Sequence, residues 1–305
     1  LLDRTFVLAF LIYFVIYSKF PLSEPHANMP AYYRADLGVE SYRLPFANLE
    51  AERTEYFECL PSDVIKQEMR NSHSTKFFVH PLMIPDYIGK ELYELLEFCG
   101  SLEVSPTSST RTVMTRSREK NFMIKVNLEK RLGERIRKLE RVQVEHSNKI
   151  MQELNTINLP NDFAYMPETI GILYTKNNDE IGMIVREFQV RPYADEKRFI
   201  LPLFSLYSLD KNNREHDPLL AQIVENSSED KYEFFHFKIL KPLISTWAYF
   251  VSEKGISPDI HAQNCLLEID EKGIPTRIIY RDLQEFFIDS RIREQKSLPM
   301  NFKRN

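Results

Sequence analysis

Residues 255–287 constrain the fold of this chain more than any other stretch, because they read as one β-hairpin. An apolar run over residues 265–269 is followed by a turn that ends at Gly273 and by a second apolar run over residues 278–280. Two such runs joined by a Gly-containing turn predict two antiparallel strands. The hairpin therefore brings together the residue before its first strand and the residue after its second strand.

Polar residues gather at the predicted open end of this hairpin. Asp259, His261, Gln263 and Asn264 precede the first strand, and Asp282 follows the second. An amide oxygen and a carboxylate oxygen held side by side are the hard ligands that suit Mg²⁺ carried on a nucleotide. The same residue types also cap turns without any further role. Both interpretations are open at this point.

The charge and the glycine pattern exclude several function classes. The net charge is −4 and the isoelectric point is near 6.1, so no overall positive field favours nucleic acid. None of the 8 glycines forms the G-x-G-x-x-G or G-x-x-x-x-G-K-[ST] pattern, which excludes the usual Rossmann and P-loop sites. Cys59, Cys99 and Cys265 show no C-x-x-C spacing, so we expect a reducing, cytoplasmic location and no zinc site.

The chain starts at Leu1 and carries an apolar run over residues 6–17. This run is shorter than the roughly 20 residues that a membrane-spanning helix needs. We expect a buried helix or strand there and no association with a membrane.

Residues 105–137 form the second informative stretch. Several hydroxyls over residues 107–112 surround Arg111, and hydroxyls with an Arg fork are typical of polyphosphate recognition where no Gly-rich loop exists. Residues 113–115 and 121–128 predict paired strands, and Lys125 within the second needs an anion as its partner. Serine- and threonine-rich stretches are also common in ordinary loops.

The rest of the pattern predicts an α+β fold, with antiparallel hairpins and packed helices rather than βαβ units. Residues 169–174 and 182–188 predict a second hairpin. Residues 130–150 and 234–253 have the apolar spacing of helices, and residues 47–70 show helical spacing as well.

Three motifs stand in the order of one known family: His80-Pro81, the hydroxyl-rich segment 106–112, and the segment 259–264 followed by Arg281-Asp282. In this combination the chain resembles the IucA/IucC-type, NRPS-independent siderophore synthetases from about residue 77 to residue 287. The resemblance implies an ATP- and Mg²⁺-dependent enzyme that adenylates citrate or a citrate derivative. An amine or an alcohol then displaces AMP.

The resemblance also implies a cradle-like ATP site between a β-rich lobe and a kinase-like palm lobe, and a possible homodimer. It divides the chain into an N-terminal remnant at residues 1–76, a phosphate-binding β-rich lobe with a helix at 77–150, and a palm-like lobe at 151–305. The residues it implies for ATP are Ser109, Arg111, Thr112, Lys125, Arg186, Gln263 and Asn264.

The resemblance places the substrate carboxylate on Arg137, His261 and Asp259, and Mg²⁺ on Asn264 and Asp282. Cationic groups and Mg²⁺ aimed at the phosphates would stabilise the charge that develops there during adenylation. The catalytic roles that it implies fall to Lys125, Arg137 and His261.

The sequence departs from the family pattern at several places. Asp259 stands where the family has Glu, Leu132-Gly133 where it has Ile-Thr, and Leu82-Met83 where a bulky polar pair is expected. The upstream G-H-P-x-H-P segment is not found, and the C-terminal helices beyond Asp282 are expected to be largely missing. The chain is therefore expected to be a partial copy of the family.

Two other interpretations stay open. Asp259 and Asn264 have the D-x-x-x-x-N spacing of a kinase catalytic loop, with Asp282 as the second metal-binding residue, although no Gly follows it. The other alternative is an inactive relative that only binds nucleotide.

Overall fold

The computed structural model describes residues 29–302, apart from residues 88–95, 110, 118–120, 133–134, 177–178, 195–196 and 209–214. The apolar run at 6–17 lies outside the described residues. The chain forms two compact units, and each is described by itself. The sheet unit comprises the described residues of Leu22–Asn155 and Pro167–Phe188, and the hairpin unit those of Thr156–Met166 and Gln189–Asn305. The predicted α+β class is confirmed, because a large antiparallel sheet and packed helices are both present.

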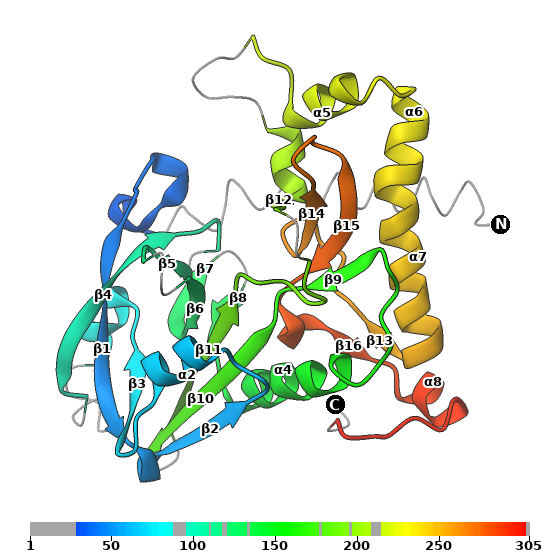
Figure 1. Cartoon of the computed structure of the whole chain (residues 1–305). Helices are drawn as coiled ribbons and strands as arrows, with labels where there is room; N and C mark the ends of the chain where they lie inside the picture. Colours follow the sequence, from blue (N-terminus) through cyan, green and yellow to red (C-terminus); the bar gives the residue numbers. More distant parts are fainter. Residues whose placement is uncertain are drawn as a thin grey trace. The chain divides into compact units, whose positions relative to one another are not determined.

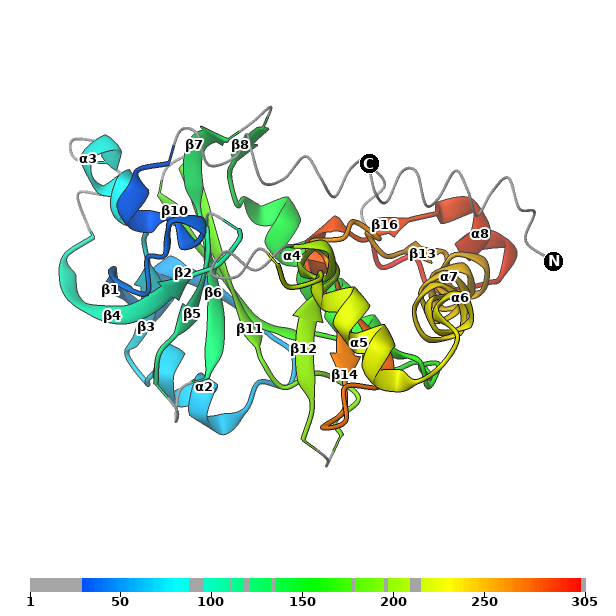
Figure 2. The ribbon, with the colours of Figure 1, turned by 90° about the horizontal axis from the view of Figure 1, so that it is seen from above.

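The sheet unit is built on eight strands in the order β2-β10-β11-β6-β5-β4-β1-β3, and all neighbours are antiparallel (Figure 1). The sheet is strongly curved (Figure 2), and its two outer strands approach each other, with the hydroxyl oxygens of Thr54 and Thr75 3.4 Å apart. The strands are β1 (Tyr42–Glu50), β2 (Thr54–Glu58), β3 (Ser74–Phe78), β4 (Phe98–Pro106), β5 (Thr112–Thr115), β6 (Phe122–Val126), β10 (Glu168–Lys176) and β11 (Asp179–Glu187). The remaining elements are α2 (Asp63–Met69), α3 (Ile84–Tyr87), α4 (Arg141–Leu154) and the small ribbon β7 (Leu128–Leu132) with β8 (Arg135–Arg137).

Successive side chains along each strand point to opposite faces of this sheet. Ile124 of β6 and Val185 of β11 point into the main apolar core, which α2 joins through Ile65 and Met69. On the other face, Ile184 packs with residues of α4 and the segment before it. Both faces are therefore covered, and β6 is buried along its whole length.

Helix α4 lies close against β10 and β11 because two glycines leave room for it. A Cβ added to Gly171 would lie 2.5 Å from a methyl group of Val144, and one added to Gly182 would lie 2.8 Å from the other methyl group of that valine. Real Cβ atoms do not approach other atoms so closely. The Val144 side chain thus fixes the distance of α4 from the sheet.

The hairpin unit contains a four-stranded sheet in the order β12-β14-β15-β9, in which β9 runs parallel to β15. A continuous helical segment from Lys231 to Lys254 packs beside β15 (Figure 1) and is viewed nearly end-on in Figure 2. Within it, α6 (Lys231–Phe234) and α7 (Lys241–Tyr249) are each followed by a π-helical stretch, Phe235–Leu240 and Phe250–Lys254. The strands are β9 (Phe163–Tyr165), β12 (Phe199–Pro202), β13 (Ile256–Ser257), β14 (Cys265–Ile269), β15 (Pro275–Tyr280) and β16 (Phe287–Ile288), and the other helices are α5 (Leu219–Ser227) and α8 (Ser290–Gln295).

Both predicted hairpins are confirmed, as β14–β15 and β10–β11, and so is the pairing of β5 with β6. The helix predicted over 130–150 is wrong in its first half. Residues 130–132 and 135–137 belong to the β7–β8 ribbon. The helix starts only after Glu140, whose side chain forms a capping box with Gln143. The helical prediction for 47–58 is also wrong, since β1 and β2 occupy most of that stretch.

No helix in the described part of the chain is both long and apolar enough to cross a membrane.

His80 is a fully buried residue of the sheet unit. Its Nδ1 accepts a hydrogen bond from the backbone N–H of Leu82 at 3.2 Å, which caps the short 3-10 helix beginning at Pro81. The ring of Tyr33 packs edge-on against the imidazole, with centroids 5.0 Å apart. Burial lowers the pKa of His80 from 6.5 to about 4, because a charged imidazolium cannot be hydrated there.

The pKa of His80 predicts an acid-dependent loss of stability. Its folded-state pKa lies below the unfolded value, so the unfolded chain takes up the proton first as the pH falls. We expect the His80 contribution to the free energy of unfolding to fall by about 3 kcal/mol between pH 6.5 and pH 4. Urea unfolding at several pH values in this window would measure it.

His80→Asn keeps a capping acceptor and removes the titrating group, so this variant should have a lower stability at pH 7 and a flatter pH dependence. His73→Gln, at an exposed histidine of the same unit, is the matched control and should keep the wild-type pH dependence. An unchanged slope in His80→Asn would contradict the prediction.

Candidate functional site

The open end of the β14–β15 hairpin brings two predicted metal ligands together. The last residue pair of the ladder is Cys265 with Tyr280, and beyond it the N–H of Arg281 donates to the carbonyl oxygen of Asn264 at 3.0 Å. Asp282 follows at once, in the left-handed conformation with φ 63° and ψ 56°. Asp tolerates this conformation better than most residues, and it turns the chain away from the strand. Asn264 and Asp282 therefore lie at the same end of the hairpin, as the sequence predicts.

The loop before β14 is held by Asp259. One carboxylate oxygen accepts from the N–H of His261 at 3.2 Å, and the other accepts from Nδ2 of Asn264 at 2.7 Å. Because Nδ2 of Asn264 is bound in this way, Oδ1 is the end of the amide that can serve as a ligand oxygen. Asp259 thus positions Asn264. Its predicted contact with the substrate carboxylate stays a prediction.

His261 is oriented by the same loop. Its Nδ1 accepts from the N–H of Gln263 at 3.2 Å, so the neutral ring carries its proton on Nε2. An N–H at Nε2 can donate to an anionic oxygen. The carbonyl of His261 accepts from the N–H groups of Asn264 and Cys265, which closes the loop as a turn.

The hairpin rests on a rigid apolar base. Tyr280 is fully buried, stacks on Phe163 with centroids 5.2 Å apart, and its hydroxyl lies 3.0 Å from that of Thr246 on α7. Burial raises the pKa of Cys265 well above its usual value. This thiol therefore stays protonated and serves as part of the base rather than as a nucleophile.

In the sheet unit, the predicted phosphate-binding residues share one face of the sheet. Lys125 of β6 lies between Thr112 of β5 and Ile184 of β11, and cross-strand partners point to the same side. Arg186 lies two residues beyond Ile184, so it points to this side as well. Ile184 packs with Val144 of α4 and with Leu139 just before that helix. This face is therefore the one that α4 covers. Lys125 is only 3% exposed and Arg186 only 2%.

A carboxylate that the sequence analysis missed completes this face. Glu168 of β10 is the register partner of Arg186, and its Oε1 lies 2.5 Å from a guanidinium nitrogen of that arginine. The other oxygen of Glu168 accepts a hydrogen bond from Ser147 of α4. The only signal in the sequence is an acid at the start of an otherwise apolar strand. Its pairing with Arg186 depends on a bulge between Glu168 and Ile170.

Ser109 and Arg111 hold the loop between β4 and β5. The Thr107 hydroxyl donates to the carbonyl of Thr112 at 2.7 Å, and the Ser109 hydroxyl lies 3.3 Å from that of Thr112. Nη1 of Arg111 donates to the carbonyls of Arg137 and Lys138, both at 2.7 Å. Arg111 therefore holds the backbone of Arg137, whose side chain is partly exposed. Direct contact of Arg111 with phosphate stays a prediction.

The predicted site residues thus fall into two groups, one built inside each unit. Thr112, Lys125 and Arg186 form one, and the 259–264 loop with Asp282 forms the other. That both groups bind one nucleotide stays a prediction. Within the described residues no group of three His, Cys, Asp or Glu side chains could hold a metal ion. The amide oxygen of Asn264 and the carboxylate of Asp282 are the kinds of oxygen that suit Mg²⁺, and binding of the ion by these two residues stays a prediction.

Comparison with known proteins gives one family match over more than half of the chain. Residues 44–208 match the IucA / IucC family, and residues 239–303 match the family described as ferric iron reductase FhuF-like transporter. No curated protein sequence matches the chain.

Several solved structures share the fold. Aerobactin synthetase IucC from a hypervirulent pathotype of Klebsiella pneumoniae aligns with a TM-score of 0.68 and 18% identity over 91% of this chain and 56% of that one. ATP-bound aerobactin synthetase IucA from the same source gives 0.66 and 18% over 88% and 54%. Petrobactin biosynthesis protein AsbB from Bacillus anthracis str. Sterne gives 0.64 and 18% over 82% and 48%. The chain spans about half the length of these structures.

The buried ion pair of Glu168 and Arg186 predicts a large effect of one substitution. Glu168→Gln keeps the shape of the side chain but replaces the buried carboxylate that pairs with Arg186 by a neutral amide. We expect the free energy of unfolding to fall by about 3–5 kcal/mol, measured by urea unfolding at pH 7.

Glu55→Gln is the matched control, because Glu55 pairs with Arg141 in the same unit while its side chain is 54% exposed. Solvent screens such a pair, and this variant should lose no more than about 1 kcal/mol. Equal decreases in the free energy of unfolding of the two variants would contradict the prediction, because they would show that burial does not increase the contribution of the Glu168–Arg186 pair.

Proposed function

The chain belongs to the IucA/IucC family, and from this premise we propose that it is part of an ATP-dependent synthetase of siderophore biosynthesis. In this proposal a citrate-type carboxylate attacks the α-phosphate of ATP, pyrophosphate leaves, and an amine or an alcohol then displaces AMP to give an amide or an ester. The structural relatives named aerobactin synthetases and petrobactin biosynthesis protein support the siderophore assignment. One of them, IucA, is ATP-bound, which supports the use of ATP.

The observation that carries the proposal is the open end of the hairpin. The Asp259 carboxylate holds Nδ2 of Asn264, so the amide presents its oxygen beside the segment that carries Asp282. Mg²⁺ at these oxygens would neutralise phosphate charge and orient the nucleotide. His261 would donate its Nε2–H to an anionic oxygen of the substrate, and Gln263 would contact the nucleotide.

The sheet unit would supply the positive charge. Lys125 and Arg186 are buried cations on one face, and Thr112 is the register partner of Lys125. Cations in a site with little water stabilise the developing charge of phosphate oxygens more strongly than in solution. Ser109 and Arg111 would complete the phosphate contacts. Arg137 would bind the substrate carboxylate.

We further propose a cytoplasmic location, because none of the three cysteines forms a disulfide. Self-association as a homodimer is part of the same proposal.

The test is carboxylate-dependent release of pyrophosphate. With ATP, Mg²⁺, citrate and an amine such as hydroxylamine, we expect pyrophosphate and AMP as products. Asp282→Asn removes one metal-ligand charge but keeps a residue that tolerates the left-handed conformation, so the rate should fall at least about 10-fold.

The matched control is Asp270→Asn, at the turn of the same hairpin, where the side chain only accepts backbone hydrogen bonds from Lys272 and Ile274. This variant should keep the wild-type rate. Release of ADP with a phosphorylated product would instead indicate the kinase-like reaction. A thermal shift with ATP-Mg²⁺ but no turnover would indicate a relative that only binds nucleotide.

A further inference from the structure

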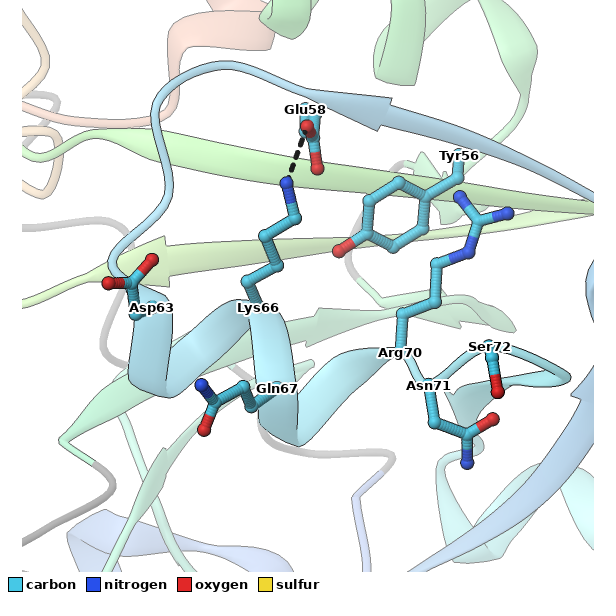
Figure 3. Close-up of a pocket in the computed structure, with 8 residues that line it drawn as sticks. All are labelled: Tyr56, Glu58, Asp63, Lys66, Gln67, Arg70, Asn71 and Ser72. Atoms are coloured by element: carbon cyan, nitrogen blue, oxygen red, sulfur yellow. Dashed lines mark hydrogen bonds and ion pairs between the residues drawn. The ribbon is translucent and has the colours of Figure 1, made fainter.

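A groove between β2 and α2 of the sheet unit lies outside both groups of predicted site residues. Tyr56 and Glu58 alternate along β2, so they share one face of the strand. Asp63 and Lys66 of α2, and Arg70 directly after the last residue of this helix, form the opposite wall. The groove has a volume of about 630 Å³, and the sticks in Figure 3 show its polar lining.

One end of the groove is rich in hydrogen-bond donors. The guanidinium of Arg70 lies 4.8 Å from the centroid of the Tyr56 ring, and within the described residues it forms no ion pair. Oδ1 of Asn71 accepts from the N–H groups of His73 and Ser74, which leaves Nδ2 as the donor end of this amide. In Figure 3 the guanidinium of Arg70 lies beside the Tyr56 ring, whereas the side chains of Asn71 and Ser72 point away from it. The guanidinium is a donor that suits an oxyanion.

The hydroxyl of Tyr56 adds a donor that has no acceptor. It is buried and forms no hydrogen bond with any described residue. Burial, and to a lesser extent the charge of Glu58, raises its pKa to about 12, so it keeps its proton at neutral pH. A buried hydroxyl without a partner is rare in folded proteins and calls for an explanation. In Figure 3 it lies between the side chains of Lys66 and Arg70.

The other end of the groove carries carboxylates. Asp63 is the first residue of α2 and Arg70 follows its last, so the length of this seven-residue helix, about 10 Å, separates them. Within the described part of the chain its carboxylate has no ion pair, whereas Glu58 accepts from Lys66 at 3.0 Å. Charge is thus separated along the groove, with an unpaired cation at one end and an unpaired anion at the other.

We propose that this groove binds a small linear zwitterion, with its carboxylate on Arg70 and Tyr56 and its ammonium group on Asp63. The separation of the charges selects a chain with several methylene groups between the two ends. Binding of this kind satisfies the Tyr56 hydroxyl and pairs both unpaired charges at once. The proposal does not rest on the ATP chemistry of the other residues.

The test is calorimetric titration of the full 305-residue chain with three probes of equal chain length. The probes are 6-aminohexanoate, which carries both charges, hexanoate, which lacks the ammonium group, and hexylamine, which lacks the carboxylate. We expect 6-aminohexanoate to bind at least about fivefold more tightly than either of the others.

Two variants separate the ends of the groove. Arg70→Gln should weaken binding of 6-aminohexanoate and hexanoate at least about fivefold, and Asp63→Asn should weaken binding of 6-aminohexanoate and hexylamine by a similar factor. Arg43→Gln is the matched control, because Arg43 is an exposed arginine on β1 that donates to Ser101 and does not line the groove. Its affinities should equal those of the wild type.

Circular dichroism and thermal unfolding would establish that each variant is folded. No saturable binding of 6-aminohexanoate would overturn the proposal. Equal affinity for all three probes would overturn it as well, and so would losses in Arg43→Gln as large as those in Arg70→Gln.

Discussion

The buried ion pair of Glu168 and Arg186 is the interaction on which the α4-covered face of the sheet depends. A guanidinium without water is stable only beside a carboxylate whose other oxygen is also satisfied, and Ser147 of α4 supplies that hydrogen bond. The helix can do so only because Gly171 and Gly182 let it approach the sheet. The position of one charge is thus set by a pair of glycines, a helix and a strand bulge acting together.

The features that could be predicted from the sequence are those determined by residues that lie close together in the chain. Each hairpin shows two apolar runs joined by a turn within about 20 residues, and this pattern predicts that the two runs pair. The meeting of Asn264 and Asp282 follows from hairpin geometry alone, without any knowledge of what packs beneath it. The α+β class follows for the same reason, since hairpins dominate the pattern.

The mispredicted features have causes far away in the sequence. The charged stretch before Glu140 has helical spacing, yet it forms a ribbon because Arg111 binds the carbonyls of Arg137 and Lys138, and Asn127 binds the N–H of Leu139. A helix would use these backbone groups internally. Glu168 escaped notice because its partner lies 18 residues later, across a bulge that no local pattern encodes.

The two groups of candidate residues share one property, which is that each is completed by contacts inside its own unit. Asp259 orients Asn264 within the hairpin unit, and Glu168 orients Arg186 within the sheet unit. A side chain oriented in this way loses little conformational freedom when a ligand arrives, which favours binding. Each group is therefore preorganised by its own unit, and a substitution that loosens one should leave the internal geometry of the other unchanged. In a chain that spans about half the length of its structural relatives, this independence is the physical basis for expecting both groups to keep their shape.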